Sequence, residues 1–311
     1  MTSQITASES TKSLRFYHRS GDIVILIESM LYRVHGDILS KHSEVFRDVL
    51  DMKGEGGTSD EVPLHLETIK MKDFDCLMSW VYDAEIRHAS PATSPSTSRE
   101  LHYDAVVSIL KLATLYQMPK ARKFAIKQIE ADDTVPPVNR MHLAELYSIP
   151  EWIAPAYQVL MKRNLLSFTE DEVALLTAPV VLILAKSHIK LIDTLTGMAY
   201  VPPLVVKSAS CSDLVHPQCE AVWKETWWTC VARHLLNPMQ RPELGKMYEF
   251  LQSLSGLDHM TLGCRGATLD ELRWHGGFDM ETRIASKAVE SITKIHSRDK
   301  VPYYSNGDEE D

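Results

Sequence analysis

The chain has 311 residues, of which 44% are hydrophobic and 24% charged, a mixture typical of about two globular domains. Its formal net charge of −9 argues against a nucleic-acid-binding surface, because neutralising phosphates requires clustered Lys and Arg. The first thirteen residues lack the apolar core of a secretory signal. Apolar runs such as Val180–Ala185 are far shorter than the roughly 20 residues that span a bilayer. We therefore expect an intracellular protein of the cytoplasm or nucleus with no membrane partner.

The first part of the chain predicts a small sheet followed by helices. Residues 1–18 are expected to be a disordered or lead-in segment, because they are short, polar and rich in Ser and Thr. The two apolar runs Asp22–Ile27 and Leu31–His35 predict a β-hairpin. A helical segment follows, with Asp37 and Ser43 as candidate N-caps. Its expected buried stripe consists of Val45, Phe46, Val49 and Leu50.

More helices are predicted after this segment. Residues 62–66 indicate an edge strand, because Pro63 removes a donor from the hydrogen-bonded ladder. An amphipathic helix with Asp73 as its candidate cap is then predicted by apolar residues at helical spacing, namely Phe74, Leu77, Met78 and Val81. After a loop of Ser, Thr, Pro and Ala at residues 90–98, a helix from Leu101 and a second one that begins at Pro119 form a predicted helical hairpin.

Several of these segments resemble a BTB/POZ domain. The matching letters are Tyr32-Arg33-Val34-His35, Ile38-Leu39-Ser40, Ser43-Glu44-Val45-Phe46-Arg47, FDCLMSWVYDAEI at residues 74–86 and Tyr116-Gln117-Met118-Pro119. The resemblance covers residues 19–131 and implies an α+β fold, in which a small sheet packs with helices and helical hairpins. The residues expected to hold this domain together are Ile23, Ile25, Leu31, Val34, Leu39, Val45, Phe46, Leu77 and Leu110.

The resemblance also implies a function without catalysis, namely protein–protein interaction. Two further roles that the family has are a substrate adaptor of a cullin-type ubiquitin ligase and a transcriptional co-regulator. The family's adaptors carry a hydrophobic-any-glutamate motif after the Ser-x-x-Phe helix, and the aligned residues Gly54-Glu55-Gly56 lack it. Many dimeric members exchange an extra N-terminal strand and helix. Residues 1–18 are too short and polar to supply both, so a homo-oligomer of the familiar kind is disfavoured.

The remainder of the chain predicts mainly helices. We expect a helical extension at residues 132–200, a C-terminal helical region with a Cys/His/Trp cluster at 201–300, and an acidic tail at 301–311. This arrangement is similar to fungal members of the BTB family. A helix is predicted over 220–236 that carries Trp223, Trp227 and Trp228. These tryptophans have two interpretations, a packed core or an anchor for a partner.

Four residues suggest a structural zinc site, namely Cys211, His216, Cys219 and Cys264. Zinc favours four thiolate or imidazole ligands in a tetrahedron, and Gly263 and Gly266 would allow Cys264 to lie on a tight turn near the ion. The spacing is not a standard Cys-x-x-Cys pair. In the alternative interpretation the cysteines are small buried hydrophobes and His216 is a solvated loop residue. Cys230 is excluded from the site, because one helix would separate it from Cys219 by roughly 16 Å.

Nothing in the sequence predicts an enzyme. Gly-rich phosphate loops and the HExxH, GxSxG and kinase signatures are absent from it, and no organic cofactor is implied. His35 is the residue that would first suggest catalysis, since histidine titrates near neutrality. No nucleophile or carboxylate is placed by sequence as its partner, so we interpret His35 as a packed, hydrogen-bonded residue.

Overall fold

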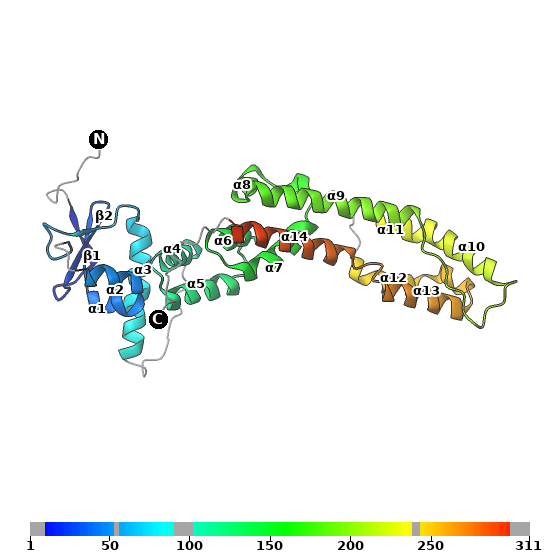
Figure 1. The fold of residues 1–311 in the computed structure, drawn as a ribbon, viewed down its shortest axis with the longest axis horizontal. Helices are drawn as coiled ribbons and strands as arrows, with labels where there is room; N and C mark the ends of the chain where they lie inside the picture. Colours follow the sequence, from blue (N-terminus) through cyan, green and yellow to red (C-terminus); the bar gives the residue numbers. More distant parts are fainter. Residues whose placement is uncertain (1–9, 53–55, 90–101, 238–242, 299–311) are drawn as a thin grey trace, which may run out of the picture. The chain divides into compact units, whose positions relative to one another are not determined.

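The computed structural model in Figure 1 describes residues 10–52, 56–89, 102–237 and 243–298. The chain divides into two compact units, Met1–Val135 and Pro136–Asp311. The described part of the first unit contains a four-stranded sheet and five α-helices, and that of the second unit is mainly helical. The predicted α+β class, with a mainly helical C-terminal region, is confirmed.

The sheet of the first unit has the order β1-β3-β2-β4. Its strands are β1 (Thr11–Tyr17), β2 (Ile23–Ile27), β3 (Met30–Val34) and β4 (Leu64–His65). Strands β2 and β3 form the predicted antiparallel hairpin, while β1 pairs with β3 and β4 pairs with β2 in parallel. The helices are α1 (Gly36–His42), α2 (Glu44–Asp51), α3 (Met71–Ala89), α4 (Tyr103–Leu115) and α5 (Pro119–Ala131). The strand predicted at 62–66 is shorter than expected but does lie at the edge.

Strand β1 lies within residues 1–18, the range that the sequence predicts to be a disordered or lead-in segment. Its backbone pairs with β3. Near its C-terminal end, the Tyr17 hydroxyl donates to Asp60 and lies 2.6 and 2.8 Å from the two carboxylate oxygens. Near its N-terminal end, the Lys12 ammonium forms an ion pair with the same carboxylate at 2.8 Å. Both contacts favour the ionised carboxylate, and the Lys12 hydrogen bond is the largest cause that lowers the pKa of Asp60. A partner some forty residues away therefore orders a stretch whose own composition is typical of disorder.

The apolar core of the first unit follows the prediction at most positions. Seven of the nine expected residues are at most 3% exposed, namely Ile25, Leu31, Val34, Leu39, Phe46, Leu77 and Leu110. Ile23 and Val45 are half-buried. Helix α2 lies at the surface and buries only Phe46, so the stripe expected there is wrong at Val49, which is 36% exposed.

Helix starts in this unit differ from the sequence prediction at two aspartates. Ser43 caps α2 as predicted, by accepting a hydrogen bond from the Phe46 backbone N–H. Helix α1 begins one residue before Asp37, and its first N–H, on Gly36, donates to the Asp22 carboxylate at 2.7 Å. Asp73 is likewise no cap but a buried residue inside the first turn of α3.

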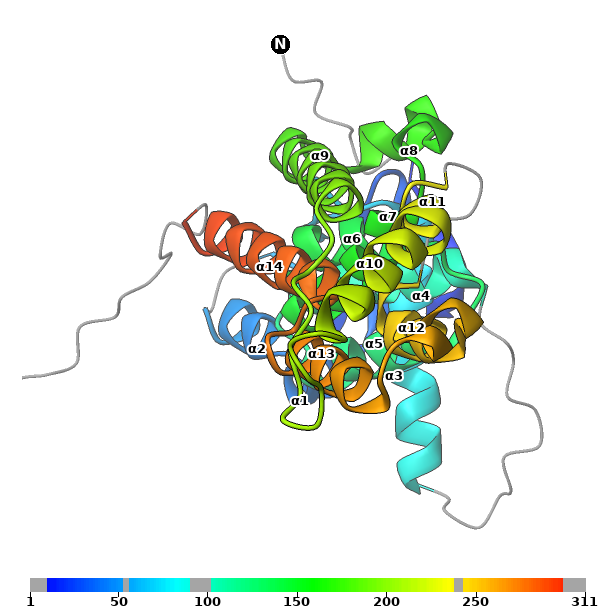
Figure 2. The ribbon, with the colours of Figure 1, turned by 90° about the vertical axis from the view of Figure 1, so that its right-hand side faces the viewer.

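The second unit is built from nine α-helices in its described part. Their bounds are α6 (Pro137–Leu146), α7 (Ile153–Lys162), α8 (Glu170–Leu175), α9 (Ala178–Tyr200), α10 (His216–Thr226), α11 (Ala232–Leu235), α12 (Met247–Ser253), α13 (Leu262–Trp274) and α14 (Met280–Arg298). Short 3₁₀ turns lie at Pro150–Trp152, Leu165–Ser167, Leu244–Lys246 and Ser255–His259. Helix α14 packs on α9 and α7, and α10 and α13 lie at the same end of the unit (Figures 1 and 2). Within the described ranges, no helix has the length and apolar character needed to cross a membrane.

The tryptophan helix begins earlier than predicted and contains a π-helical turn, η4 (Trp227–Val231), between α10 and α11. Trp223 and Trp227 are each 1% exposed, and their indole N–H groups donate to the carbonyls of Pro203 (2.9 Å) and Met198 (3.1 Å). Trp228 is half-exposed. The core interpretation therefore holds for Trp223 and Trp227, because both rings are enclosed and both polar atoms have partners.

Candidate functional site

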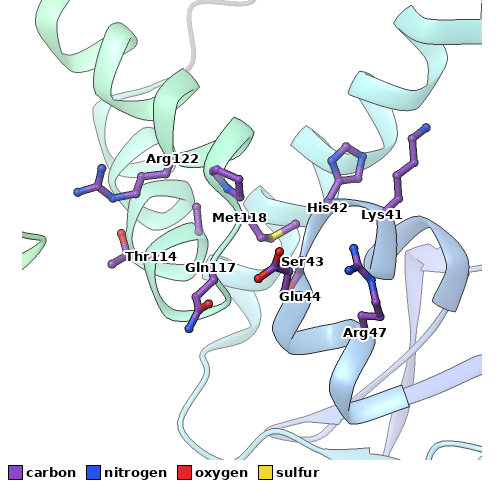
Figure 3. Close-up of a pocket in the computed structure, with 11 residues that line it drawn as sticks. Lys41, His42, Ser43, Glu44, Arg47, Thr114, Gln117, Met118 and Arg122 are labelled. Carbon is purple, nitrogen blue, oxygen red and sulfur yellow. The ribbon is translucent and has the colours of Figure 1, made fainter. Parts of the chain in front are cut away.

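A groove in the first unit lies between the α1–α2 junction and the α4–α5 junction (Figure 3). Its volume is about 450 Å³. Ser43 joins the two sides, because its hydroxyl donates a hydrogen bond to the Tyr116 carbonyl at 2.6 Å. The rings of Phe46 and Tyr116 also stack, with their centroids 4.4 Å apart. Buried contacts of this kind keep the two junctions together, so the groove is preformed.

The floor of the groove is buried, whereas its rim carries mostly positive charge. His42, Ser43 and Met118 are buried on the floor. The lining residues come from helix junctions about seventy positions apart in the chain: Lys41, His42, Ser43, Glu44, Arg47, Ala113, Thr114, Gln117, Met118, Pro119 and Arg122. Three of them are cations and one is a carboxylate, so the groove is locally positive although the whole chain is acidic.

The second candidate site is a cluster of four side chains in the second unit. Cys211 lies in the irregular segment before α10, His216 and Cys219 lie in the first turns of α10, and Cys264 lies in the first turn of α13. One ligand atom of each residue, a thiol sulfur or an imidazole nitrogen, lies within 4.8 Å of all the others. The three cysteines are buried and free of disulfides. The structure thus brings together the four residues that the sequence singled out.

Local capping explains how two helix starts come to face each other. Proline at the second position of α10 suits a helix start, where its missing N–H needs no partner. Thr261 caps α13 by accepting a hydrogen bond from the Cys264 backbone N–H at 3.4 Å. Cys264 therefore lies in a helix and not on the expected tight turn. His216 is the first residue of α10, with a side chain only 15% exposed, so it is not a solvated loop residue.

Polar contacts surround the sulfur atoms of the cluster. Desolvation would raise the pKa of the Cys264 thiol, but hydrogen bonds from the Ser208 backbone N–H, Thr261 and His216 outweigh it and lower that pKa to about 6. For Cys211, desolvation is the largest effect and raises the pKa. Lys207 forms an ion pair with Asp213 and also interacts electrostatically with the Cys211 and Cys264 thiols. The surroundings can accommodate negative charge on sulfur.

His35 has the packed role that the sequence predicted. Its Nδ1 lies 3.0 Å from the Tyr82 hydroxyl and its Nε2 lies 3.0 Å from the Ser20 hydroxyl. A serine–histidine pair resembles part of a hydrolase triad, but the group on the far nitrogen is a phenol where a triad has a carboxylate. His18 also packs against the imidazole, with ring centroids 5.4 Å apart. The geometry is that of a structural hydrogen-bond network.

Comparison with known proteins identifies the first unit. Residues 12–132 match the family model of the BTB/POZ domain. This segment is a BTB/POZ domain. The match includes β1 from Lys12 onward and helices α1 to α5, so the resemblance predicted from the motifs is confirmed. No curated protein matches the chain in a sequence comparison.

The BTB/POZ domain is a protein–protein interaction module, which agrees with the predicted interaction function. Two of the three positions aligned with the adaptor motif, Gly54 and Glu55, lie outside the described residues. Sequence analysis did not predict that the groove residues form one site, although Ser43, Arg47 and Met118 had carried the resemblance. The two sides of the groove share no sequence pattern that would predict that they meet. The family motif was the feature of the sequence from which these residues could have been found.

Proposed function

We propose that the chain is a non-enzymatic scaffold whose BTB/POZ domain binds an acidic segment of a partner protein in the groove between the α1–α2 and α4–α5 junctions. The observation that carries the proposal is the groove itself, a preformed cavity with a buried floor and an excess of cations on its rim. A scaffold of this kind would work in the cytoplasm or nucleus, where thiols stay reduced.

The chemistry of the partner follows from the lining residues. Lys41 and Arg47 line the groove from the α1–α2 side and Arg122 lines it from the α5 side. Arg47 lies beside Ser43 and Glu44, whereas the charged ends of Lys41 and Arg122 extend away from them (Figure 3). We therefore expect Arg47 to contact a carboxylate of the bound segment directly and the other two cations to attract it at longer range. Met118 is also a lining residue, although it is only 1% exposed. Charges on the rim of an interface mainly raise the association rate and select the partner, whereas the buried floor contributes to affinity.

The test is affinity capture with the intact chain from its native cell extract, followed by identification of the bound proteins. Reversing two charges of the groove, with Arg47→Glu and Arg122→Glu together, should remove the specific partner and leave the fold intact. Lys127→Glu is the matched control, because Lys127 is an exposed cation of the same helix α5 outside the groove. Equal loss of the partner in the control variant, or retention in the double variant, would contradict the proposal.

The identity of the captured protein separates this scaffold from its rivals. Recovery of a cullin scaffold that depends on the exposed face of α2, where Val49 is 36% exposed, would favour the ubiquitin-ligase adaptor. Recovery of chromatin-associated proteins would favour a transcriptional co-regulator. Recovery of the chain itself, measured with two differently tagged copies, would indicate a homo-oligomer.

A further inference from the structure

At the end of the second unit that holds the four-residue cluster, an irregular segment lies against helices α10 and α13. Residues 201–215, which precede α10, form no helix or strand. This segment nevertheless passes close to α13, where a Cβ atom at Gly263 would overlap the Ser208 hydroxyl. A cross-link between the segment and the two helix starts would explain how an irregular chain is held so closely.

The cluster has the dimensions of a tetrahedral metal site. Zinc–sulfur bonds of about 2.3 Å and zinc–nitrogen bonds of about 2.0 Å place tetrahedral ligand atoms about 3.5–3.8 Å apart. The Cys264 sulfur lies 3.6 Å from Nδ1 of His216, and all four ligand atoms fall within 4.8 Å of one another. The three cysteines form no disulfide bond, so their sulfur atoms are free to bind an ion.

The outer contacts of the ligands are also those of a metal site. Nδ1 of His216 faces the cluster, while its Nε2 lies 3.5 Å from the Glu220 carboxylate one turn further along α10. A carboxylate behind a ligating histidine fixes the tautomer and the ring orientation. Backbone N–H groups of Ser208 and Thr261 point at the Cys264 and Cys219 sulfurs, each at 3.4 Å. Such donors stabilise thiolates, the form in which cysteine binds zinc.

We propose that Cys211, His216, Cys219 and Cys264 bind one Zn²⁺ ion in a closed, structural site. All four tetrahedral positions are filled by protein atoms, which leaves none for a water or a substrate and distinguishes a structural site from a catalytic one. The ion clips residues 201–215 to the starts of α10 and α13. This site is independent of the BTB/POZ groove, so either proposal can fail without the other.

The first test uses the intact chain, purified under reducing conditions without added chelator. Elemental analysis should find one zinc per chain, and a metal-depleted sample should regain one Zn²⁺ or Co²⁺. The cobalt form should have thiolate-to-cobalt charge-transfer absorption in the near ultraviolet and intense visible bands, as tetrahedral sulfur ligation requires. A folded chain that contains no zinc and gives no such cobalt spectrum would overturn the proposal, as would a native disulfide between two of the cysteines.

Substitutions then test the ligands one at a time. Cys264→Ser and His216→Asn should each lose the stoichiometric zinc, whereas Cys230→Ser should retain it, because Cys230 lies in η4 of the same unit and outside the cluster. If removing a ligand prevents folding, Glu220→Gln provides a milder test. It keeps all four ligands and should weaken zinc affinity by roughly 10-fold or more, measured by competition with a chromophoric chelator. Unchanged affinity in Glu220→Gln together with zinc retained in Cys264→Ser would refute the assigned site.

Discussion

The BTB/POZ domain and the cluster-bearing end of the second unit both have apolar cores, but the second also contains four side chains suited to a metal ion. In the BTB/POZ domain, the largest buried side chains are aromatic and aliphatic, such as Phe46, Phe74 and Leu77, and burial of apolar surface accounts for most of the stability. Around the cluster, an irregular segment meets two helix starts through sulfur and imidazole groups. An apolar core is insensitive to metal and redox state, whereas thiol ligands depend on both.

Metal removal should separate the two regions most clearly. Structural zinc sites in small domains contribute on the order of 10 kcal/mol of apparent binding free energy. We therefore expect a strong chelator to abolish amide-exchange protection in α10 and α13, while β2, β3 and α3 keep theirs. Hydrogen exchange with mass spectrometry gives both readings in one sample. Equal loss of amide-exchange protection in both regions, or no loss in either, would contradict the expected difference between them.

Phe46→Ala should give the largest effect in the BTB/POZ domain. The ring is 1% exposed and stacks on Tyr116, so its removal leaves a cavity and should cost about 3–5 kcal/mol of unfolding free energy. Urea denaturation followed by circular dichroism measures the change. Val49→Ala on the same helix is the control and should cost well under half as much, because Val49 is 36% exposed. An unchanged midpoint for Phe46→Ala would show that the core is assigned wrongly.

Ser43→Ala should have an intermediate effect on the same domain. The substitution removes the N-cap of α2 and leaves the Tyr116 carbonyl without its hydroxyl donor, at an expected cost of about 2–3 kcal/mol. Ser43→Thr retains the hydroxyl and should recover much of the loss. Partner capture is a second measurement, because the Ser43 contact joins the two walls of the groove. A stable Ser43→Ala domain with full partner binding would show that this contact does not organise the groove.

The smallest effect concerns the acid stability of the BTB/POZ domain. Asp73 is 4% exposed and accepts hydrogen bonds from Ser108 and Lys111, both at 2.7 Å. Desolvation opposes ionisation, but these two partners outweigh it and lower the pKa of Asp73. A lowered pKa in the folded state means that the ionised form stabilises the fold above the ordinary aspartate pKa of about 3.9. That contribution disappears as the pH falls through the folded-state pKa.

We therefore expect Asp73→Asn to lose about 1 kcal/mol or more near neutral pH and to differ less from the native chain below about pH 4. Denaturation midpoints of both chains between neutral and acidic pH give the difference directly. If the denaturation midpoints of the two chains change with pH in parallel, the Asp73–Lys111 pair does not contribute to acid stability as proposed.

Much of the fold could be predicted from local patterns. The hairpin, the Ser43 cap, the Pro119 helix start and most of the BTB/POZ core depend on residues that are close in sequence, where periodicity and capping chemistry are directly visible. The four candidate zinc ligands were also selected from local information, namely residue type, spacing and the exclusion of Cys230 by helix geometry. Whether they hold zinc stays a prediction.

Other features were decided by tertiary structure. Strand β1 is polar, and it becomes a strand because β3 pairs with it and Asp60 binds both of its ends. The groove lies between two helix junctions that share no sequence pattern. Cys264 was expected on a tight turn but lies at the start of α13, because Thr261 caps that helix. The sequence by itself determined the BTB/POZ domain and the residue types of the cluster, because these rest on short-range patterns and side-chain chemistry. Only the tertiary structure decided which distant groups meet, because pairing and packing energies depend on positions that no local pattern contains.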